Sequence, residues 1–182
     1  IVLIGRKVLR ESNLNLVEVY MLYLFSGSGL MLFISAGDLM TLFLGLELSS
    51  LPMYVLAGFA RNDKRSNEAG LKYFLLSAFS SAFLLLGIAL LYGSSGSTNL
   101  SDIYASQALD NNALTQSMSV LGWSMLLLSL AFKVALFPAH GWVADVYEGS
   151  TTIFTAFLAA LVKIAAVGAF FRVSEYIPLS SQ

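Results

Sequence analysis

The chain has 182 residues, a formal net charge of −1, and a composition that is 57% hydrophobic and 12% charged. A soluble domain of this length needs more charge to cover its surface, and the mean hydropathy of +0.77 is also typical of a membrane protein. The near-zero net charge gives no indication of a nucleic-acid partner, and the absence of cysteine excludes disulfides, thiolate metal sites and iron–sulfur ligation.

The chain opens with a polar lead-in, residues 1–16. Only five apolar residues, IVLIG, precede Arg6, so the opening lacks the long apolar region of a signal peptide. The first residue is not Met, and we expect the chain to be a fragment of a longer one.

Five apolar segments are long enough to cross a bilayer as helices, which takes roughly 17–25 residues. They run over residues 17–36, 39–60, 69–92, 120–137 and 152–171. The sequence therefore predicts an all-α, polytopic membrane protein. We expect residues 17–172 to form a single five-helix unit, followed by a tail at residues 173–182.

The positions of the cations predict the orientation in the membrane. The link RNDKRSNE holds three of the ten cations, and the lead-in holds three more. By the positive-inside rule both face the cytoplasm or the mitochondrial matrix. The link over residues 93–119 has no Lys or Arg and falls on the opposite side, where Arg172 is the one discordant cation.

Three ionisable residues stand inside long apolar segments: Glu47 in LFLGLELSSLPMY, Lys133 in LLSLAFKVALFPAHGW and Lys163 in FLAALVKIAAVGAF. A charge at the centre of a membrane helix costs about 2.5–3.5 kcal/mol on insertion scales. At about 1.5 Å per residue, Glu47 and Lys163 lie well inside their segments. The pattern therefore indicates a proton or ion pathway.

Prolines follow two of these charges at the same spacing, Pro52 after Glu47 and Pro138 after Lys133. A proline within a helix removes a donor and clashes with the carbonyl four residues earlier. His140 and Gly141 come next, so we expect the fourth helix to be broken at Pro138, with its continuation at membrane depth, as in transporter ion sites. The alternative is a plain helix end from which Lys133 extends to the interface.

These residue types suit proton transfer. A buried lysine can hold or lose a proton, and a nearby carboxylate favours holding it. We expect Glu47 to act as a gate for Lys133, Lys163 to be the next station, and His140 to be a possible relay. A static ion pair that orients helices is the alternative for Glu47 and Lys133, and a structural role at the helix break is the alternative for His140. Small residues four apart, such as Ser77 with Ser81 and Gly45 with Ser49, are expected to be packing contacts.

Four stretches together resemble a known family. GDLMTLFLGLELSSLPMYVL, RSNEAGLKYFLLSAFSS, LAFKVALFPAHGWVADVYEGS and TAFLAALVKIAA are similar to the N-type antiporter-like subunits of respiratory complex I, which include mitochondrial NADH dehydrogenase subunit 2. The match spans most of residues 38–172 in order. The chain departs from the family after Tyr147-Glu148-Gly149, where the family commonly has prolines and this chain reads STTIFTAF.

The resemblance implies a proton-translocating membrane-arm subunit of NADH:quinone oxidoreductase. It matches Glu47 and Lys133 to the family's Glu–Lys pair, Lys163 to its central relay lysine, and Lys72 to a lysine of its hydrophilic axis. It also implies that this chain binds no cofactor or metal, and that NADH, FMN, iron–sulfur clusters and quinone belong to partner subunits. Only the first of the family's two inverted five-helix units is matched, so we expect a partner chain to supply the second.

Two other functions remain open. A subunit of a multisubunit sodium/proton antiporter resembles the same unit, and would work without NADH and depend on sodium. A structural membrane subunit without transport would tolerate replacement of Lys133. The expected location is the mitochondrial inner membrane, with a bacterial plasma membrane, or a thylakoid carrying a ferredoxin-driven version of the complex, as alternatives.

Overall fold

The computed structural model describes residues 2–11, 14, 16–109 and 112–177, and it is helical throughout its regular structure. Five helical segments within these ranges are long and apolar enough to cross a membrane. They are α2 (Val17–Ser35), α3 (Leu39–Ala57), α4 (Lys64–Ser95), α6 (Ala113–Val134), and the continuous run of α8 (Thr152–Phe157), a π-helical turn η1 (Leu158–Val162) and α9 (Lys163–Ser174). Three shorter helices complete the described chain: α1 (Val2–Glu11), α5 (Leu100–Leu109) and α7 (Val143–Gly149). The predicted all-α, polytopic fold is confirmed.

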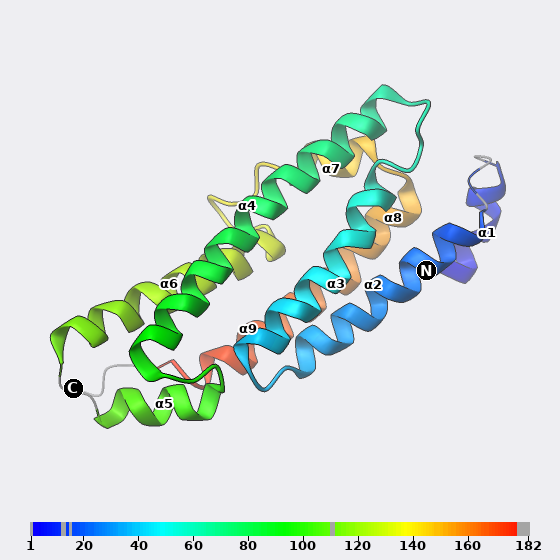
Figure 1. The fold of residues 1–182 in the computed structure, drawn as a ribbon. Coiled ribbons are helices and arrows are strands. Elements are labelled where there is room, and N and C mark those ends of the chain that lie inside the picture. The colour runs from blue at the N-terminus through cyan, green and yellow to red at the C-terminus, as the bar shows by residue number, and fades with distance from the viewer. Residues whose placement is uncertain (1, 12–13, 15, 110–111, 178–182) are drawn as a thin grey trace.

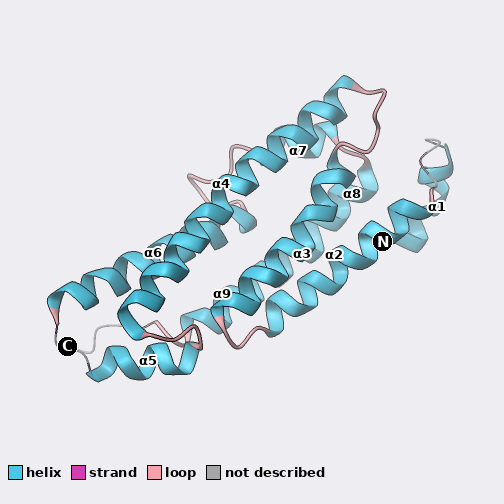
Figure 2. Ribbon diagram, in the orientation of Figure 1, coloured by secondary structure: helices cyan, strands magenta, loops and turns pink. Residues whose placement is uncertain are grey.

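The helices form one elongated bundle (Figure 1). Helices α2 and α3 pack as an antiparallel hairpin, α4 packs along α6, and α9 contacts both α2 and α6. Short loops join most of the helices (Figure 2). The loop before α4 lies at the same end of the bundle as α1 and α7, whereas α5 lies at the other end (Figure 1). The cations of the lead-in and those of the link RNDKRSNE therefore lie at the same end of the bundle, as the positive-inside rule requires.

Helices α2 and α3 approach closely because a glycine stands where they cross. A Cβ added to Gly45 would lie 2.5 Å from the backbone nitrogen of Phe33 on α2. Real Cβ atoms do not come so close, so only glycine fits at this point. The packing role that the sequence indicated for Gly45 is borne out by this contact.

Two helices begin earlier than the apolar segments in the sequence. Helix α4 begins at Lys64 rather than Ala69, because the Asp63 side chain accepts a 2.9 Å hydrogen bond from the backbone N–H of Arg65 and caps the helix. Helix α6 begins at Ala113, where the Asn112 side chain accepts from Leu114 N–H. A search for apolar segments does not detect a helical turn made of polar residues. Such a turn destabilises the helix little when it lies outside the membrane.

The break after α6 is sharper and earlier than a proline kink. The helix ends at Val134, and Ala135 takes a left-handed conformation with φ of 63°. That conformation costs a residue with a Cβ roughly 1–2 kcal/mol. The Phe137–Pro138 peptide bond is cis, and α7 begins only at Val143. The predicted break at Pro138 is therefore confirmed, with the helix ending four residues before the proline.

Trp142 holds the broken segment against the bundle. Its indole N–H donates to the carbonyl oxygen of Phe132 at 3.2 Å, which satisfies one acceptor at the open end of α6. Its ring stacks on Phe132 and Tyr73, with centroids 5.3 and 5.1 Å apart. The side chain is buried, so the break is a fixed part of the packed core.

The division of the chain into lead-in, single unit and tail stays a prediction. The lead-in contains α1, and the end of the predicted tail, residues 178–182, lies outside the described residues.

Candidate functional site

Lys133 is the buried cation of the bundle. It stands in the last turn of α6, and only 3% of the residue is exposed. Its ammonium donates to the Ser50 hydroxyl on α3 at 2.9 Å and to the Ser77 hydroxyl on α4 at 3.5 Å. Three helices thus meet at one charge. Lys133 points inward rather than extending to the interface, which contradicts the alternative of a lysine at a plain helix end.

Two aromatic rings complete the surroundings of this ammonium. Its nitrogen lies 5.7 Å from the ring centre of Tyr73 and 6.0 Å from that of Tyr54. A cation within about 6 Å of an aromatic face is attracted by the ring electrons. Hydroxyls and rings are neutral partners, so Lys133 is stabilised without a carboxylate in direct contact.

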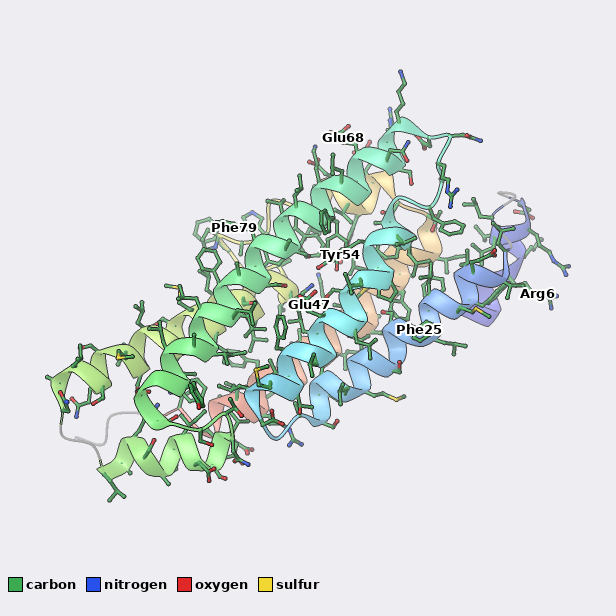
Figure 3. All side chains as sticks on the ribbon, in the orientation of Figure 1. Arg6, Phe25, Glu47, Tyr54, Glu68 and Phe79 are labelled. Atoms are coloured by element: carbon green, nitrogen blue, oxygen red, sulfur yellow. The ribbon has the colours of Figure 1, made fainter. Side chains whose placement is uncertain are left out.

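Glu47 lies on the side of α3 that faces α4, like Tyr54 (Figure 3). Its carboxylate accepts a 2.5 Å hydrogen bond from the Ser81 hydroxyl. Ser81 is one helical turn beyond Ser77, the partner of Lys133. Glu47 and Lys133 thus bond to neighbouring serines of one helix, but no ion pair within 4.0 Å joins them among the described side chains. The alternative of a static contact pair between them is not supported.

Lys163 begins α9, immediately after the π-helical turn. Its nitrogen lies 5.7 Å from the ring centre of Tyr147 on α7, and the residue is half-buried. π-turns occur often at functional sites. Here the turn directly precedes a lysine at membrane depth, opposite the helix that follows the break.

Lys72 has a different environment. It donates to Asp145 on α7 and to Glu68 on its own helix, both at 2.7 Å, and its side chain is 41% exposed. A second pair, Arg65 with Glu148 at 3.5 Å, joins the same two helices. These groups line a surface hollow of about 240 Å³ at the cationic end of the bundle. The Lys72 contacts fasten α7 to α4.

His140 lies in the break and is exposed. Its ring centre is 5.7 Å from that of Phe137, and its backbone carbonyl accepts from Val143 N–H. No contact within the described residues joins its imidazole to Lys133 or Lys163. The structure therefore brings Glu47 and Lys133 to neighbouring serines of α4. It places Lys163 beside Tyr147 of α7 and leaves Lys72 and His140 outside these contacts.

Sequence reasoning assigned Ser77 and Ser81 to helix packing and assigned no role to Ser50, Tyr54, Tyr73 or Tyr147. The structure places all six beside Glu47, Lys133 or Lys163. The spacing of the α4 residues could have predicted part of this site, because Tyr73, Ser77 and Ser81 recur every four residues and thus share one face of the helix. No group of three His, Cys, Asp or Glu side chains suited to a metal ion occurs in the described part of the chain.

Comparison with known proteins gives a consistent result. A family model described as "NADH:quinone oxidoreductase/Mrp antiporter, TM" matches residues 36–182. NADH-quinone oxidoreductase subunit N of Beutenbergia cavernae is 50% identical over 165 residues, which are 90% of this chain and 31% of that protein. The chain spans about a third of the length of the curated relatives that it matches.

Two solved structures contain the same fold. A chain of respiratory complex I from Thermus thermophilus, with bound aureothin, is 39% identical with a TM-score of 0.76, over 88% of this chain and 35% of that one. A chain of the Mrp complex from a Dietzia species is 28% identical with a TM-score of 0.72, over 84% of this chain and 28% of that one. The resemblance that the motifs indicated is confirmed.

Proposed function

Because the chain belongs to the NADH:quinone oxidoreductase/Mrp antiporter transmembrane family, we propose that it is proton-translocating machinery of a complex I membrane-arm subunit. Protons would pass along an axis formed by Glu47, Lys133 and Lys163. Electron transfer from NADH to quinone would occur in partner subunits, which would hold the flavin, the iron–sulfur clusters and the quinone. This chain would then contribute to NADH:quinone reductase as a subunit, without a redox site of its own.

The observation that supports this function most strongly is the burial of Lys133 among neutral partners. The ammonium is bonded to two hydroxyls and flanked by two rings. A cation in such a place is costly, and membrane proteins keep such groups for transport. Because no carboxylate holds it directly, Lys133 can lose and regain a proton without breaking a contact ion pair. Glu47, bonded to a serine of α4 one turn from Ser77, belongs to α3, so movement of α6 relative to α3 would change its distance from Lys133.

The test is Lys133→Met in the assembled complex, in native membrane vesicles. Methionine fills a similar volume without the charge. We expect NADH-driven proton uptake to fall by at least about tenfold, since a proton-transfer group typically contributes a factor of about 10²–10⁴. The amount of assembled complex should change much less. Glu47→Gln should act in the same direction.

The matched control is Lys64→Met, which removes an exposed lysine at the start of α4. It should pump like the parent protein. Normal pumping by both Lys133→Met and Glu47→Gln would exclude the axis and favour a structural subunit.

The second candidate is sodium/proton antiport, which the structural match to the Mrp complex supports. That function predicts proton flux that requires sodium and continues without NADH. Proton flux measured in the same vesicles, with and without sodium and with and without NADH, separates the two candidate functions.

The bacterial origin of the relative from Beutenbergia cavernae supports the bacterial plasma membrane as the location. The mitochondrial inner membrane and the thylakoid stay predictions from the sequence. The partners we propose are the lipid bilayer and other membrane-arm subunits, including the part of the machinery that supplies a second helix repeat.

A further inference from the structure

Three tyrosine hydroxyls are buried without a hydrogen-bond partner among the described residues: those of Tyr54, Tyr73 and Tyr147. The great majority of buried polar side-chain atoms in proteins are hydrogen-bonded, and each exception calls for a physical reason. Leaving a buried hydroxyl unpaired destabilises the folded protein. Phenylalanine would fill the same space at no such cost, so packing alone does not account for tyrosine at all three positions.

The three rings are placed at the two lysines of the axis. Tyr54 and Tyr73 flank the Lys133 ammonium, and their ring centres are 5.2 Å apart. Tyr147 flanks the Lys163 ammonium at 5.7 Å. The rings that carry these hydroxyls thus lie against the two cations that a proton would visit in succession.

The helices that present these tyrosines also present the other polar groups of the site. Tyr73 precedes Ser77 by four residues on α4, and the Ser77 hydroxyl accepts a hydrogen bond from the Lys133 ammonium at 3.5 Å. Tyr54 follows Glu47 by seven residues, which is two turns of α3 and returns it to nearly the same face. Tyr147 belongs to α7, whose backbone carbonyl at that residue accepts from the Thr155 hydroxyl of α8 at 3.2 Å. That bond ties the tyrosine of one helix to the segment that leads to Lys163.

We infer that the hydroxyls of Tyr54, Tyr73 and Tyr147 are transfer groups between Lys133 and Lys163. This inference rests on the proposed proton-translocating function and adds residues to the path. A phenol both donates and accepts a hydrogen bond. It can accept a proton from the Lys133 side on its oxygen while it releases its own proton toward Lys163, so that it returns to the neutral state. Lys133 loses one proton and Lys163 gains one, with water molecules bridging the hydroxyls and the ammoniums, because none of the three tyrosine hydroxyls is hydrogen-bonded to either lysine among the described residues.

The experiment compares Tyr147→Phe with Tyr23→Phe in the assembled complex. Tyr147→Phe keeps the ring beside Lys163 and removes only the hydroxyl. Tyr23 is also a buried tyrosine, on α2, where its ring lies 5.1 Å from that of Phe157. The lysine–ring contacts of the described residues do not include it. We expect Tyr147→Phe to lower the protons taken up per NADH oxidised by about tenfold, the effect of one lost hydrogen-bonded step, and Tyr23→Phe to leave this ratio unchanged.

The pH profile separates a transfer role from a structural one. If the hydroxyl transfers protons, slow transfer makes proton supply limiting, and pumping by Tyr147→Phe falls more steeply than the parent's as pH rises. A structural loss lowers pumping by the same factor at every pH and lowers the assembled amount, and that result would overturn the inference. Tyr54→Phe and Tyr73→Phe should show the same steeper profile.

Lys133→Met in the same vesicles distinguishes failure of the tyrosine inference from failure of the proposed function. If Lys133→Met stops pumping while Tyr147→Phe pumps like Tyr23→Phe, the tyrosine inference is wrong and the axis stands. If Lys133→Met also pumps normally, the proposed function itself is wrong.

Discussion

Lys133 and Lys72 both belong to membrane-spanning helices, yet their partners differ in kind. Lys72 is 41% exposed and bonds to two carboxylates at 2.7 Å. Lys133 is 3% exposed and bonds to two hydroxyls. The exposed lysine is paired with more negative charge than it carries, whereas the buried one contacts neutral polar and aromatic groups among the residues that the structure describes.

This difference distinguishes a lysine that holds two helices together from a lysine suited to proton transfer. Two carboxylates keep Lys72 charged and hold α7 against α4, and solvent screens their attraction so that each pair contributes little to stability. Neutral hydroxyls satisfy the Lys133 ammonium but do not neutralise it, so its charge responds to any carboxylate that approaches. A cation that must change its state is best placed among partners that tolerate both states, because hydroxyls can donate as well as accept.

The largest effect should come from the partners of Lys133. Ser50→Ala removes the 2.9 Å bond to the buried ammonium, and hydrogen bonds to charged groups contribute about 1.5–3 kcal/mol. We expect the complex to lose stability by that amount when it is heated in mild detergent. Ser49→Ala is the matched control, because Ser49 and Ser50 both donate to the Leu46 carbonyl but only Ser50 contacts Lys133. Equal losses in the two variants would mean that the Lys133 bond contributes nothing.

A smaller effect is expected at Asp38, a carboxylate whose partners are neutral. The Thr41 hydroxyl, at 2.5 Å, and the Thr41 and Met40 backbone N–H groups lower the pKa of Asp38 below its ordinary value, against the opposing effect of burial. Because the folded pKa lies below the unfolded one, the stabilisation is complete above the unfolded pKa of about 3.9 and is lost as pH falls through the folded pKa.

The variant Asp38→Asn keeps a capping side chain at the start of α3 and removes the charge, at a cost of about 0.3–1 kcal/mol near neutral pH. The measurement is the melting temperature of parent and variant in mild detergent between pH 6 and pH 3. The difference between them should shrink as pH falls. A difference that does not depend on pH would show that the Asp38 charge has no part in it.

The smallest effect should come from Asp145→Asn, which removes one of the two carboxylates from Lys72. Glu68 stays in contact, and solvent screens such exposed pairs so that each contributes little to stability. The loss of stability in detergent should diminish further in high salt, where exposed charges are screened. A loss as large as that of Ser50→Ala, unchanged by salt, would contradict the division between the two lysines.

The sequence predicts the fold well because long apolar runs and the placement of cations follow from the bilayer itself. It also identifies Lys133 as a buried charge, because the break after α6 keeps this lysine inside the bundle. The starts of two helices, at Lys64 and Ala113, were missed, because the capping residues lie in polar links where hydropathy carries no information.

The site was harder to predict. Serine is both a small residue for close packing and a hydrogen-bond donor, so Ser77 and Ser81 looked like packing residues until their partners on other helices were known. Ser50 and Tyr147 come from helices whose relative rotation no single sequence specifies. The absence of a direct Glu47–Lys133 contact likewise depends on how α3 and α6 are rotated relative to each other, since these helices carry the two residues.

The π-helical turn before Lys163 has a consequence for protein engineering. A π-turn closes its hydrogen bonds over one residue more than an α-helix, and one residue corresponds to about 100° of rotation around the axis. An idealised helix built through residues 152–174 would therefore turn Lys163 to a different side of the bundle, although every residue would be kept. A grafted or redesigned version of this segment must omit one residue between Leu158 and Val162 to keep the lysine beside Tyr147.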